Sequence, residues 1–434
     1  METGKYCVIG AGPSGLAALK NLAERGIPVE GLEREDDVGG NWYYGRPNSS
    51  VYASTHLISS KRTTEYIDFP MPKEYPPYPS HAQALSYLRA YARQHQLYDR
   101  IRFGTSVARV EFRLGGDSRS PTWLVTTDRG ETREYAGLVV ANGHHWDPLW
   151  PQVPGEFTGR QMHAHDYKTP EVLAGRRVLV IGAGNTGCDI AVEAAQHASS
   201  TLHSLRRGYH FLPKFLFGRP VDSGAEWFQR RRFPRWLQRW LIGWMVRIAA
   251  GNPERFGLPR PDHRLFESHP IINSQLFYYL GHGRIQVRPG IERLCGTKVR
   301  FVDGREDEVD LIVWATGYRI SFPFLESRLV LDEVGYPRLF LNAFHPDYDN
   351  FFVAGLIQPN SGQWGITDWQ CRLMAAFIAA QQQAPAKADR FRKLKAGRPE
   401  NTSGGIRYVP SPRHILEVEY YSYRERLKKL VQTL

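Results

Sequence analysis

A fold of the α/β class is predicted by two observations on this 434-residue chain. Short apolar strands alternate with helical segments, and two of these strand–helix units carry the same glycine pattern, at residues 10–15 and 182–187. In such a unit the first glycine makes the turn, the second admits a pyrophosphate, and the third packs helix against strand. One pattern alone is a weak signal, but two in full strand–turn–helix context predict two Rossmann-like domains and two bound dinucleotides.

The first unit begins with the apolar strand Tyr6–Ile9 and continues into a helix over Leu16–Arg25. Its second strand, Val29–Glu33, ends in an acidic residue. A carboxylate about 20 residues beyond the glycines accepts hydrogen bonds from a ribose diol and repels a 2′-phosphate. The first site should therefore hold FAD or NAD. The residues expected to line it are Gly10, Gly12, Pro13, Ser14, Gly15 and Glu33.

The second unit runs from the strand Arg177–Ile181 into a helix over Cys188–His197. Its second strand, Thr201–Leu205, is followed by Arg206 and Arg207, with no acid at that place. Guanidinium groups bind phosphate through a planar fork of donors, so this pair suits the 2′-phosphate of NADPH. A solvated basic turn is the alternative. The other expected contacts are Gly182, Gly184, Asn185, Thr186 and Gly187.

Composition agrees with an enzyme of more than one domain, because single hydrophobic cores stop growing beyond about 250–300 residues. No window approaches the roughly 20 apolar residues of a membrane span, and the first strand starts too early to leave room for a signal peptide. The four cysteines, Cys7, Cys188, Cys295 and Cys371, lie far apart in the sequence. We therefore expect no redox dithiol, no metal site and a reducing, cytoplasmic location.

Part of the net charge of +12 lies in a Trp- and Arg-rich segment, Trp227–Arg247. Basic proteins often meet nucleic acids or membranes, but NADPH is itself polyanionic, so no nucleic-acid partner is expected. On a helix, Trp236, Trp240 and Trp244 would share one face. This pattern leaves open ordinary packing over a substrate channel, a peripheral membrane contact, and a contact between the subunits of a homodimer.

The region between the two fingerprints resembles the F-x-G-x-x-x-H-x-x-x-Y signature of flavin-containing monooxygenases. The matching positions are Phe157, Gly159, His163 and Tyr167. Three further segments resemble that family in the expected order: its GG-x-W segment at Gly39–Trp42, its NADPH-phosphate strand at Ser204–Gly208 and its ATGY linker at Ala315–Tyr318. The resemblance implies FAD in the first site and NADPH/NADP⁺ in the second.

The same resemblance implies a reaction. NADPH reduces FAD, and the reduced flavin takes O2 to form a C4a-hydroperoxyflavin, which passes one oxygen atom to the substrate. The expected substrate is a small soft nucleophile that undergoes N- or S-oxygenation. Baeyer–Villiger oxidation of ketones is the alternative, although that signature ends in Trp where this chain has Tyr167. An NADPH oxidase releasing H2O2 and a partner-binding protein on a flavoprotein scaffold also stay open.

Further strands at 138–143, 309–314 and 351–355, the last followed by a helix starting near Thr367, suggest how the domains are arranged. The second domain is most simply inserted into the first. Residues 1–168 and 315–434 then form the FAD domain, and residues 169–314 form the NADPH domain with the Trp/Arg-rich insertion.

The resemblance also extends the cofactor-binding set. It adds Gly40, Trp42, Ala315, Thr316, Gly317, Tyr318 and Gln358. His163 is expected to hold the linker between domains rather than act as a base. Four other residues are weaker candidates near the flavin or the substrate: His144, His145, Asn360 and Trp364.

One departure from the family concerns the flavin N5 atom. Well-known members place an Asn a few residues after a Tyr, whereas the stretch Tyr52–Lys61 contains none. Aligning on Ser-Ser-Lys puts Ile58 at that position, and an isoleucine side chain cannot donate or accept a hydrogen bond. Ser59, Ser60 and Lys61 are therefore the catalytic candidates near N5 and the nicotinamide.

Overall fold

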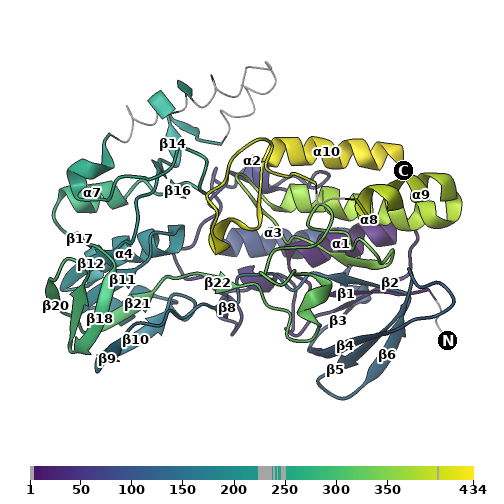
Figure 1. The fold of residues 1–434 in the computed structure, drawn as a ribbon, viewed down its shortest axis with the longest axis horizontal. Helices are drawn as coiled ribbons and strands as arrows, with labels where there is room; N and C mark the ends of the chain where they lie inside the picture. The colour runs from purple at the N-terminus through teal and green to yellow at the C-terminus, as the bar shows by residue number, and fades with distance from the viewer. Residues whose placement is uncertain (1–3, 223–236, 238–239, 242, 246–250, 398–399) are drawn as a thin grey trace. The chain divides into compact units, whose positions relative to one another are not determined.

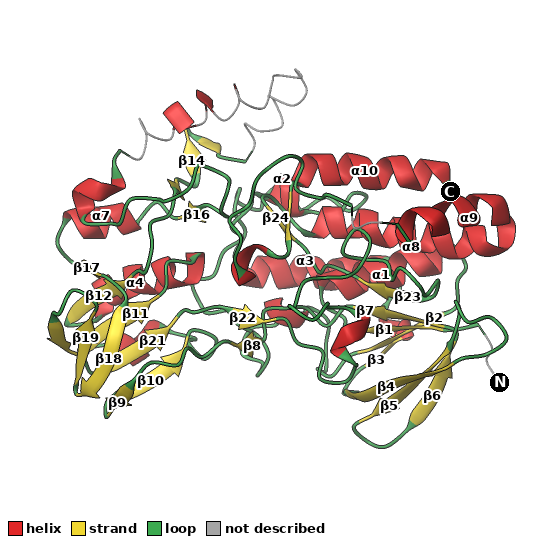
Figure 2. Cartoon of the chain, viewed as in Figure 1, coloured by secondary structure: helices red, strands yellow, loops and turns green. Residues whose placement is uncertain are grey.

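The computed structural model describes residues 4–222, 237, 240, 241, 243–245, 251–397 and 400–434. The chain divides into two units, each a mixture of helices and strands (Figures 1 and 2). The first unit contains Met1–Ser49, Ser59–His144 and Ile320–Leu434, and the second contains Ser50–Ile58 and His145–Arg319. No helix among these described residues is both long and apolar enough to cross a membrane.

The first unit is built on a five-stranded parallel sheet. In spatial order its strands are β23 (Phe351–Val353), β7 (Gly137–Val140), β1 (Tyr6–Ile9), β2 (Val29–Leu32) and β3 (Ile101–Arg102). β1 and β7 are buried along their whole length, as apolar strands of a parallel sheet are. The register places Ile9 beside Leu32 and Val140. The carboxyl ends of β1, β2 and β7 thus meet at one edge, where open α/β sheets bind ligands.

Helices and smaller sheets complete the first unit. They are α1 (Pro13–Glu24), α2 (Lys61–Thr64), α3 (His81–Gln94), α8 (Trp364–Gln383), α9 (Pro385–Lys395), α10 (Tyr420–Thr433), β4 (Val107–Arg113), β5 (Thr122–Thr127), β6 (Thr132–Tyr135), β24 (Gln358–Pro359) and β25 (Glu417–Val418). α8 packs against both α1 and α10 (Figure 1). Lys20 of α1 is buried, and its ammonium lies 2.6 Å from Asp68 and 3.6 Å from Asp368 of α8. These paired charges fix the helix that follows the first glycine turn.

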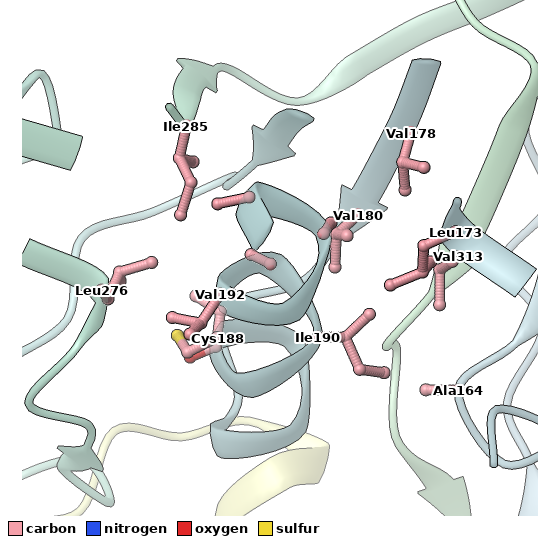
Figure 3. Close-up of a cluster of buried hydrophobic side chains, with 14 of the residues drawn as sticks. Ala164, Leu173, Val178, Val180, Cys188, Ile190, Val192, Leu276, Ile285 and Val313 are labelled. Carbon is pink, nitrogen blue, oxygen red and sulfur yellow. The ribbon is translucent and has the colours of Figure 1, made fainter. Parts of the chain in front are cut away.

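The second unit contains a parallel sheet of the same kind. Its strands in spatial order are β10 (Arg160–His163), β21 (Leu311–Trp314), β11 (Arg177–Ile181), β12 (Ser200–Ser204) and β17 (Gln286–Arg288). α4 (Asn185–His197) follows β11, and its Ile190 and Val192 belong to the same buried cluster as Val180 (Figure 3). The apolar residues of the second fingerprint unit therefore form the core that holds its glycine turn.

The other elements of the second unit are short. They are β8 (Asp147–Pro148), β9 (Gly155–Phe157), β13 (Phe211–Leu212), β14 (Phe215–Leu216), β15 (Arg219–Pro220), β16 (Ile271–Ile272), β18 (Ile291–Gly296), β19 (Lys298–Phe301), β20 (Glu306–Glu308), β22 (Tyr318–Arg319) and α7 (Leu276–Gly281). β20, β19, β18 and β9 form a second sheet, and β22 pairs with β8.

The division of the chain differs from the predicted boundaries in three places. Residues 145–168 belong to the second unit because β10 joins its sheet beside β21. Residues 315–319 follow because β22 pairs with β8. Residues 50–58 also belong there, since the Ala53 amide donates to the Lys168 carbonyl at 2.8 Å. These long-range pairings cannot be read from local sequence patterns.

Two predicted helices also need comment. α8 begins at Trp364, so Thr367 lies in its first turn and not at its cap. The Trp227–Arg247 segment lies mostly outside the described residues, and Trp227 and Trp236 are among those outside. Trp240 and Trp244 are described, and they are 62% and 58% exposed.

Candidate functional site

The first glycine turn follows β1 and can be built only from glycine. Gly10 has φ +102°, and a Cβ on it would lie 2.7 Å from the Ala141 carbonyl oxygen. A Cβ on Gly15 would overlap the Gly10 carbonyl. Gly12 is the N-cap of α1 and provides no side-chain cap, and Pro13 at the start has no N–H to satisfy. The first turn of α1 therefore presents uncapped N–H groups and the positive end of the helix dipole.

A second glycine-rich segment lies directly against this turn. A Cβ on Gly40 would lie 2.8 Å from Gly12 Cα, and the Gly39 amide donates to the Ala11 carbonyl at 3.0 Å. Trp42 follows in the same short 3₁₀ helix, and its ring meets Trp364 edge-on with centroids 5.6 Å apart. The structure thus brings the segment of Gly40 and Trp42 to the first fingerprint, and their cofactor role stays a prediction.

Glu33 connects the end of the first β–α–β unit to the same turn. Its carboxylate accepts a hydrogen bond from the Ala11 amide at 2.6 Å and another from the Glu35 amide at 3.0 Å. The residue is buried, and desolvation raises the pKa of its carboxyl group. A carboxylate offers about four lone-pair sites, so acceptor capacity remains for the hydroxyl groups of a ribose.

Three side chains support the first turn: Ser14, which the sequence predicts, and Tyr66 and Gln363, which it does not. The Tyr66 hydroxyl, in a buried side chain, donates to the Pro13 carbonyl at 2.7 Å. Ser14 lies so close to Gly355 that a Cβ on that glycine would overlap its hydroxyl oxygen. Gln363 donates to the carbonyls of Gly355 and Ile357 at 3.0 and 3.1 Å. No motif in the sequence indicates Tyr66 or its partner.

The predicted contacts after β23 are engaged with their own unit. The Gln358 side chain donates to Glu417 at 3.1 Å, and its backbone pairs β24 with β25. The Asn360 side chain accepts from the Tyr420 amide at 3.0 Å, at the start of α10. The cofactor role of Gln358 and the substrate role of Asn360 stay predictions.

The three catalytic candidates lie at the start of α2. The Ser59 hydroxyl pairs with that of Thr64 at 2.8 Å, and Ser60 is buried. The Lys61 ammonium donates to the carbonyls of Pro72, Lys73 and Tyr75 at 3.0, 3.0 and 2.6 Å. An ammonium has three donors, so these bonds account for all of them. This geometry favours a positioning role for Lys61, which holds the backbone of residues 72–75.

The second glycine turn, after β11, requires glycine for the same steric reasons. Gly182 has φ +114°, and a Cβ on it would overlap the Ala315 carbonyl, whereas one on Gly187 would overlap the Gly182 carbonyl. Around Gly184, in contrast, a Cβ would meet nothing within 4 Å. Gly184 is also the N-cap of α4 and provides no side-chain cap. Open space beside uncapped N–H groups is what a pyrophosphate requires.

His203 of β12 is a second residue that the sequence did not single out. Burial lowers its pKa to about 4, so the ring is neutral near pH 7. Its Nε2 lies 2.9 Å from the Gly182 carbonyl oxygen, and a neutral ring makes this contact as a donor. Asn185 contributes from α4 by accepting the Ile272 amide at 2.8 Å, which fixes β16. The sequence signal for His203 is weak: one histidine in a short strand that also contains two serines and a threonine.

The two arginines after β12 have different environments. Arg206 is exposed, and no carboxylate among the described residues forms an ion pair with it. Arg207 donates to Asp262 at 2.8 Å, and the other oxygen of Asp262 lies 2.7 Å from His263 Nδ1. Hydrogen bonds from His263 and Arg207 lower the pKa of Asp262 to about 2. Asp262 is far from Arg207 in the sequence, so the motif gave no sign of this pairing.

The signature residues are packing residues of the second unit. Phe157 is buried, and a Cβ on Gly159 would lie 2.6 Å from its ring. His163 is fully buried, and its Nδ1 accepts the His165 amide at 3.0 Å. The Tyr167 hydroxyl donates to Glu193 of α4, and its ring lies 5.7 Å from that of Tyr52.

The ATGY segment holds the second turn and the chain around it. The Ala315 amide donates to the Ile181 carbonyl at 2.8 Å, and the Thr316 hydroxyl donates to the Leu149 carbonyl at 2.6 Å. The Leu149 amide in turn donates to the Gly317 carbonyl at 3.0 Å. The Tyr318 ring lies within 6.0 Å of the rings of His145, His163 and His165. The contacts observed for residues 315–318 are within the second unit, and their predicted role in cofactor binding stays a prediction.

Both turns fit a dinucleotide on these observations. Each combines two glycines at which a Cβ would overlap backbone, Gly10 and Gly15 or Gly182 and Gly187, with an α-helix whose N-terminus has no side-chain cap. No group of three or more His, Cys, Asp or Glu side chains in the described part of the chain is arranged to hold a metal ion.

Comparisons with known proteins agree with this geometry. The sequence model of the family described as "Flavin-binding monooxygenase-like" matches residues 3–434. Rabbit (Oryctolagus cuniculus) flavin-containing monooxygenase 5 is 32% identical over 98% of this chain and 82% of its own length. Dimethylaniline monooxygenase [N-oxide-forming] 2 from Macaca mulatta is 33% identical over 88% of this chain and 75% of its own length.

A solved structure shows the same fold at lower sequence identity. The open structure of cyclohexanone monooxygenase superimposes with a TM-score of 0.71 at 19% identity and covers 100% of this chain and 98% of that one. The family match across nearly the whole sequence, together with a solved relative in complex with FAD and NADP, supports FAD and NADPH as the cofactors. The chain therefore belongs to the flavin-binding monooxygenase-like family.

Proposed function

We propose that this monooxygenase uses NADPH and O2 to add one oxygen atom to the nitrogen or sulfur of a small soft nucleophile. The observation that carries the proposal is the presence of two uncapped dinucleotide turns in one chain, one in each unit. A relative with 33% identity that is named for N-oxide formation supports the choice of substrate. The Tyr167–Lys168 ending of the signature supports it further, because the Baeyer–Villiger signature has a different ending.

The chain's own residues then have binding and positioning roles. Gly10, Gly12 and Gly15 would receive the FAD pyrophosphate at α1, with Glu33 at its ribose. Gly184 and the first turn of α4 would receive that of NADPH. A bound flavin supplies the redox and oxygen chemistry, which amino-acid side chains cannot perform. The protein's part is to hold both cofactors, to exclude water and to complement charge.

Side-chain chemistry agrees with this division of labour. All four cysteines are free thiols, and Cys7, Cys188 and Cys371 are buried. Burial raises the pKa of the Cys7 and Cys371 thiols, which disfavours the thiolate that a disulfide reductase needs. Free thiols throughout also support the proposed cytoplasmic location.

Product analysis tests the proposed reaction. The purified protein would be loaded with FAD and given NADPH and O2 with dimethylaniline, methyl phenyl sulfide or cyclohexanone in separate reactions. N-oxide and sulfoxide at yields close to the NADPH consumed are the expected result. Lactone from cyclohexanone alone would instead support the Baeyer–Villiger alternative. H2O2 equal to the NADPH consumed, with no oxygenated product, would support the oxidase alternative. That alternative rests on Ile58, which stands where the family has an Asn.

We also propose that the Trp227–Arg247 segment makes a peripheral contact with a membrane or with a second subunit. The exposure of Trp240 and Trp244, together with the arginines around them, supports this. Sedimentation with anionic and neutral vesicles, and light scattering after gel filtration, separate the two cases. A protein that is monomeric and stays in the supernatant with both kinds of vesicle would show that the segment serves neither purpose.

A further inference from the structure

Asp262 occupies a position that matters for the choice between NADPH and NADH. Its carboxylate accepts a hydrogen bond from the Arg207 guanidinium at 2.8 Å. The segment that carries it lies tightly against the arginine turn, because a Cβ on Gly208 would overlap the backbone of Pro259 and Arg260. The ion pair is therefore part of the fold of this turn.

The neighbours of Asp262 keep it in place and charged. His263 Nδ1 lies 2.7 Å from its second oxygen, and the His263 side chain is only 4% exposed. His210 Nε2 in turn lies 2.8 Å from the His263 carbonyl oxygen. Asp262 itself is 55% exposed, so a ligand that comes to Arg207 from solvent meets a fixed negative charge.

The consequence follows from the charges involved. A phosphate monoester carries about −1.5 to −2 charges near pH 7 and seeks the donors of the same guanidinium, one of which Asp262 already occupies. To use Arg207, a 2′-phosphate must displace the carboxylate or share the guanidinium with a like charge. Arg206 has no such competitor among the described residues and is exposed.

We propose that Asp262 is an internal competitor of the 2′-phosphate, which masks Arg207 and leaves Arg206 as the main phosphate ligand. The two arginines that look equivalent in the sequence are then unequal in function. Asp262 lowers the preference of the enzyme for NADPH over NADH, because NADH has no phosphate for the carboxylate to oppose. This inference rests on the proposed use of the second turn for NADPH.

The test is Asp262→Asn, with the Kd of NADP⁺ and of NAD⁺ measured by calorimetry on the FAD-loaded protein. The matched control is Glu308→Gln, because Glu308 also pairs with an arginine, Arg177, and is 53% exposed. Asp262→Asn should tighten NADP⁺ binding by about threefold to tenfold, a range reduced for solvent screening, and leave NAD⁺ unchanged. Glu308→Gln should change neither.

The arginine variants complete the experiment. Arg206→Ala should weaken NADP⁺ binding strongly in either background, whereas Arg207→Ala should matter only when Asp262 is Asn. Weaker NADP⁺ binding in Asp262→Asn would overturn the proposal, since the carboxylate would then position Arg207 for the phosphate. An equal gain for NAD⁺, or in Glu308→Gln, would overturn it in favour of a general charge effect. If Arg206→Ala affects NADP⁺ and NAD⁺ equally, the assignment of the second turn to NADPH fails as well.

Discussion

The substitution Gly184→Ala separates cofactor binding from folding. At this position an added Cβ meets nothing within 4 Å, and the backbone has φ −68°, which alanine adopts without strain. The folding cost is limited to replacing glycine by alanine at the N-cap, about 0.5–1 kcal/mol. In a chain of this size we expect a Tm decrease of only about 2–4 °C.

The effect on the cofactor should be much larger. A Cβ in the open space keeps the pyrophosphate at van der Waals distance, about 3.5–4.0 Å from the methyl carbon. The N–H groups at the start of α4 would then lose hydrogen bonds to a charged acceptor, each worth about 1.5–3 kcal/mol. Loss of one such bond corresponds to about a 10- to 100-fold weaker Kd for NADP⁺.

Calorimetry with NADP⁺, thermal unfolding and flavin absorbance together form the assay. Gly116→Ala is the control, because a Cβ there also meets open space, in a loop of the first unit. The Gly184 variant should keep its FAD, show only the small Tm decrease given above and lose NADP⁺ affinity, whereas the control should keep its FAD and its NADP⁺ affinity. Unchanged NADP⁺ binding in the Gly184 variant would refute the placement of the pyrophosphate at this turn. Loss of FAD together with NADP⁺ would show that the substitution disturbs more than the second site.

Three further substitutions test other parts of the argument. Replacing Arg206 and Arg207 together by Ala should raise the KM for NADPH by at least about 10- to 100-fold and leave that for NADH nearly unchanged; equal losses would remove the 2′-phosphate assignment. His203 has its pKa lowered from 6.5 to about 4, so the stability gained by keeping it neutral is fully present above pH 6.5 and is lost as the pH falls toward 4. In urea unfolding, His203→Leu should have a lower free energy of unfolding than the unmodified protein at pH 7, and it should lose less of it between pH 7 and pH 5. An equal loss in the two proteins between these pH values would contradict this. Lys61→Met should lower the Tm without changing the Kd of NADP⁺, whereas unchanged stability with altered cofactor binding would restore Lys61 as a candidate beside the nicotinamide.

The nucleotide turns could be predicted because their determinants are local. A glycine that must take a positive φ, or must let a helix touch a strand, leaves its mark at a fixed spacing, and Gly10 and Gly182 behave as the pattern requires. The position of Glu33 beside the turn could be predicted for the same reason, since it directly follows the strand next to the turn. The sequence alone does not distinguish Arg206 from Arg207 as a phosphate ligand. Asp262, which pairs with Arg207, is brought to it only by folding of the intervening chain.

The boundaries of the two units differ from the predicted domain boundaries for a related reason. The predicted boundary at residue 168 places the signature, which precedes the second fingerprint, in the FAD domain. The structure instead adds its strand to the second sheet beside β21. Residues 50–58 show the limit more sharply: the Tyr52 hydroxyl donates to Asp189 of α4 at 2.8 Å, which joins a short loop to a helix far along the chain. No periodicity within that loop indicates its partner.

The same glycine pattern has different surroundings in the two turns, and this bears on how the cofactors are held. The middle glycine of the first turn, Gly12, lies against Gly40, and Trp42 and Trp364 pack beside that segment. The middle glycine of the second turn, Gly184, has open space at the corresponding place. A turn flanked by a second backbone segment and by packed rings suits a cofactor that remains bound through many reaction cycles. A turn open on the same side suits a cofactor that must enter and leave in each cycle, which is the distinction that a flavin and a nicotinamide dinucleotide require.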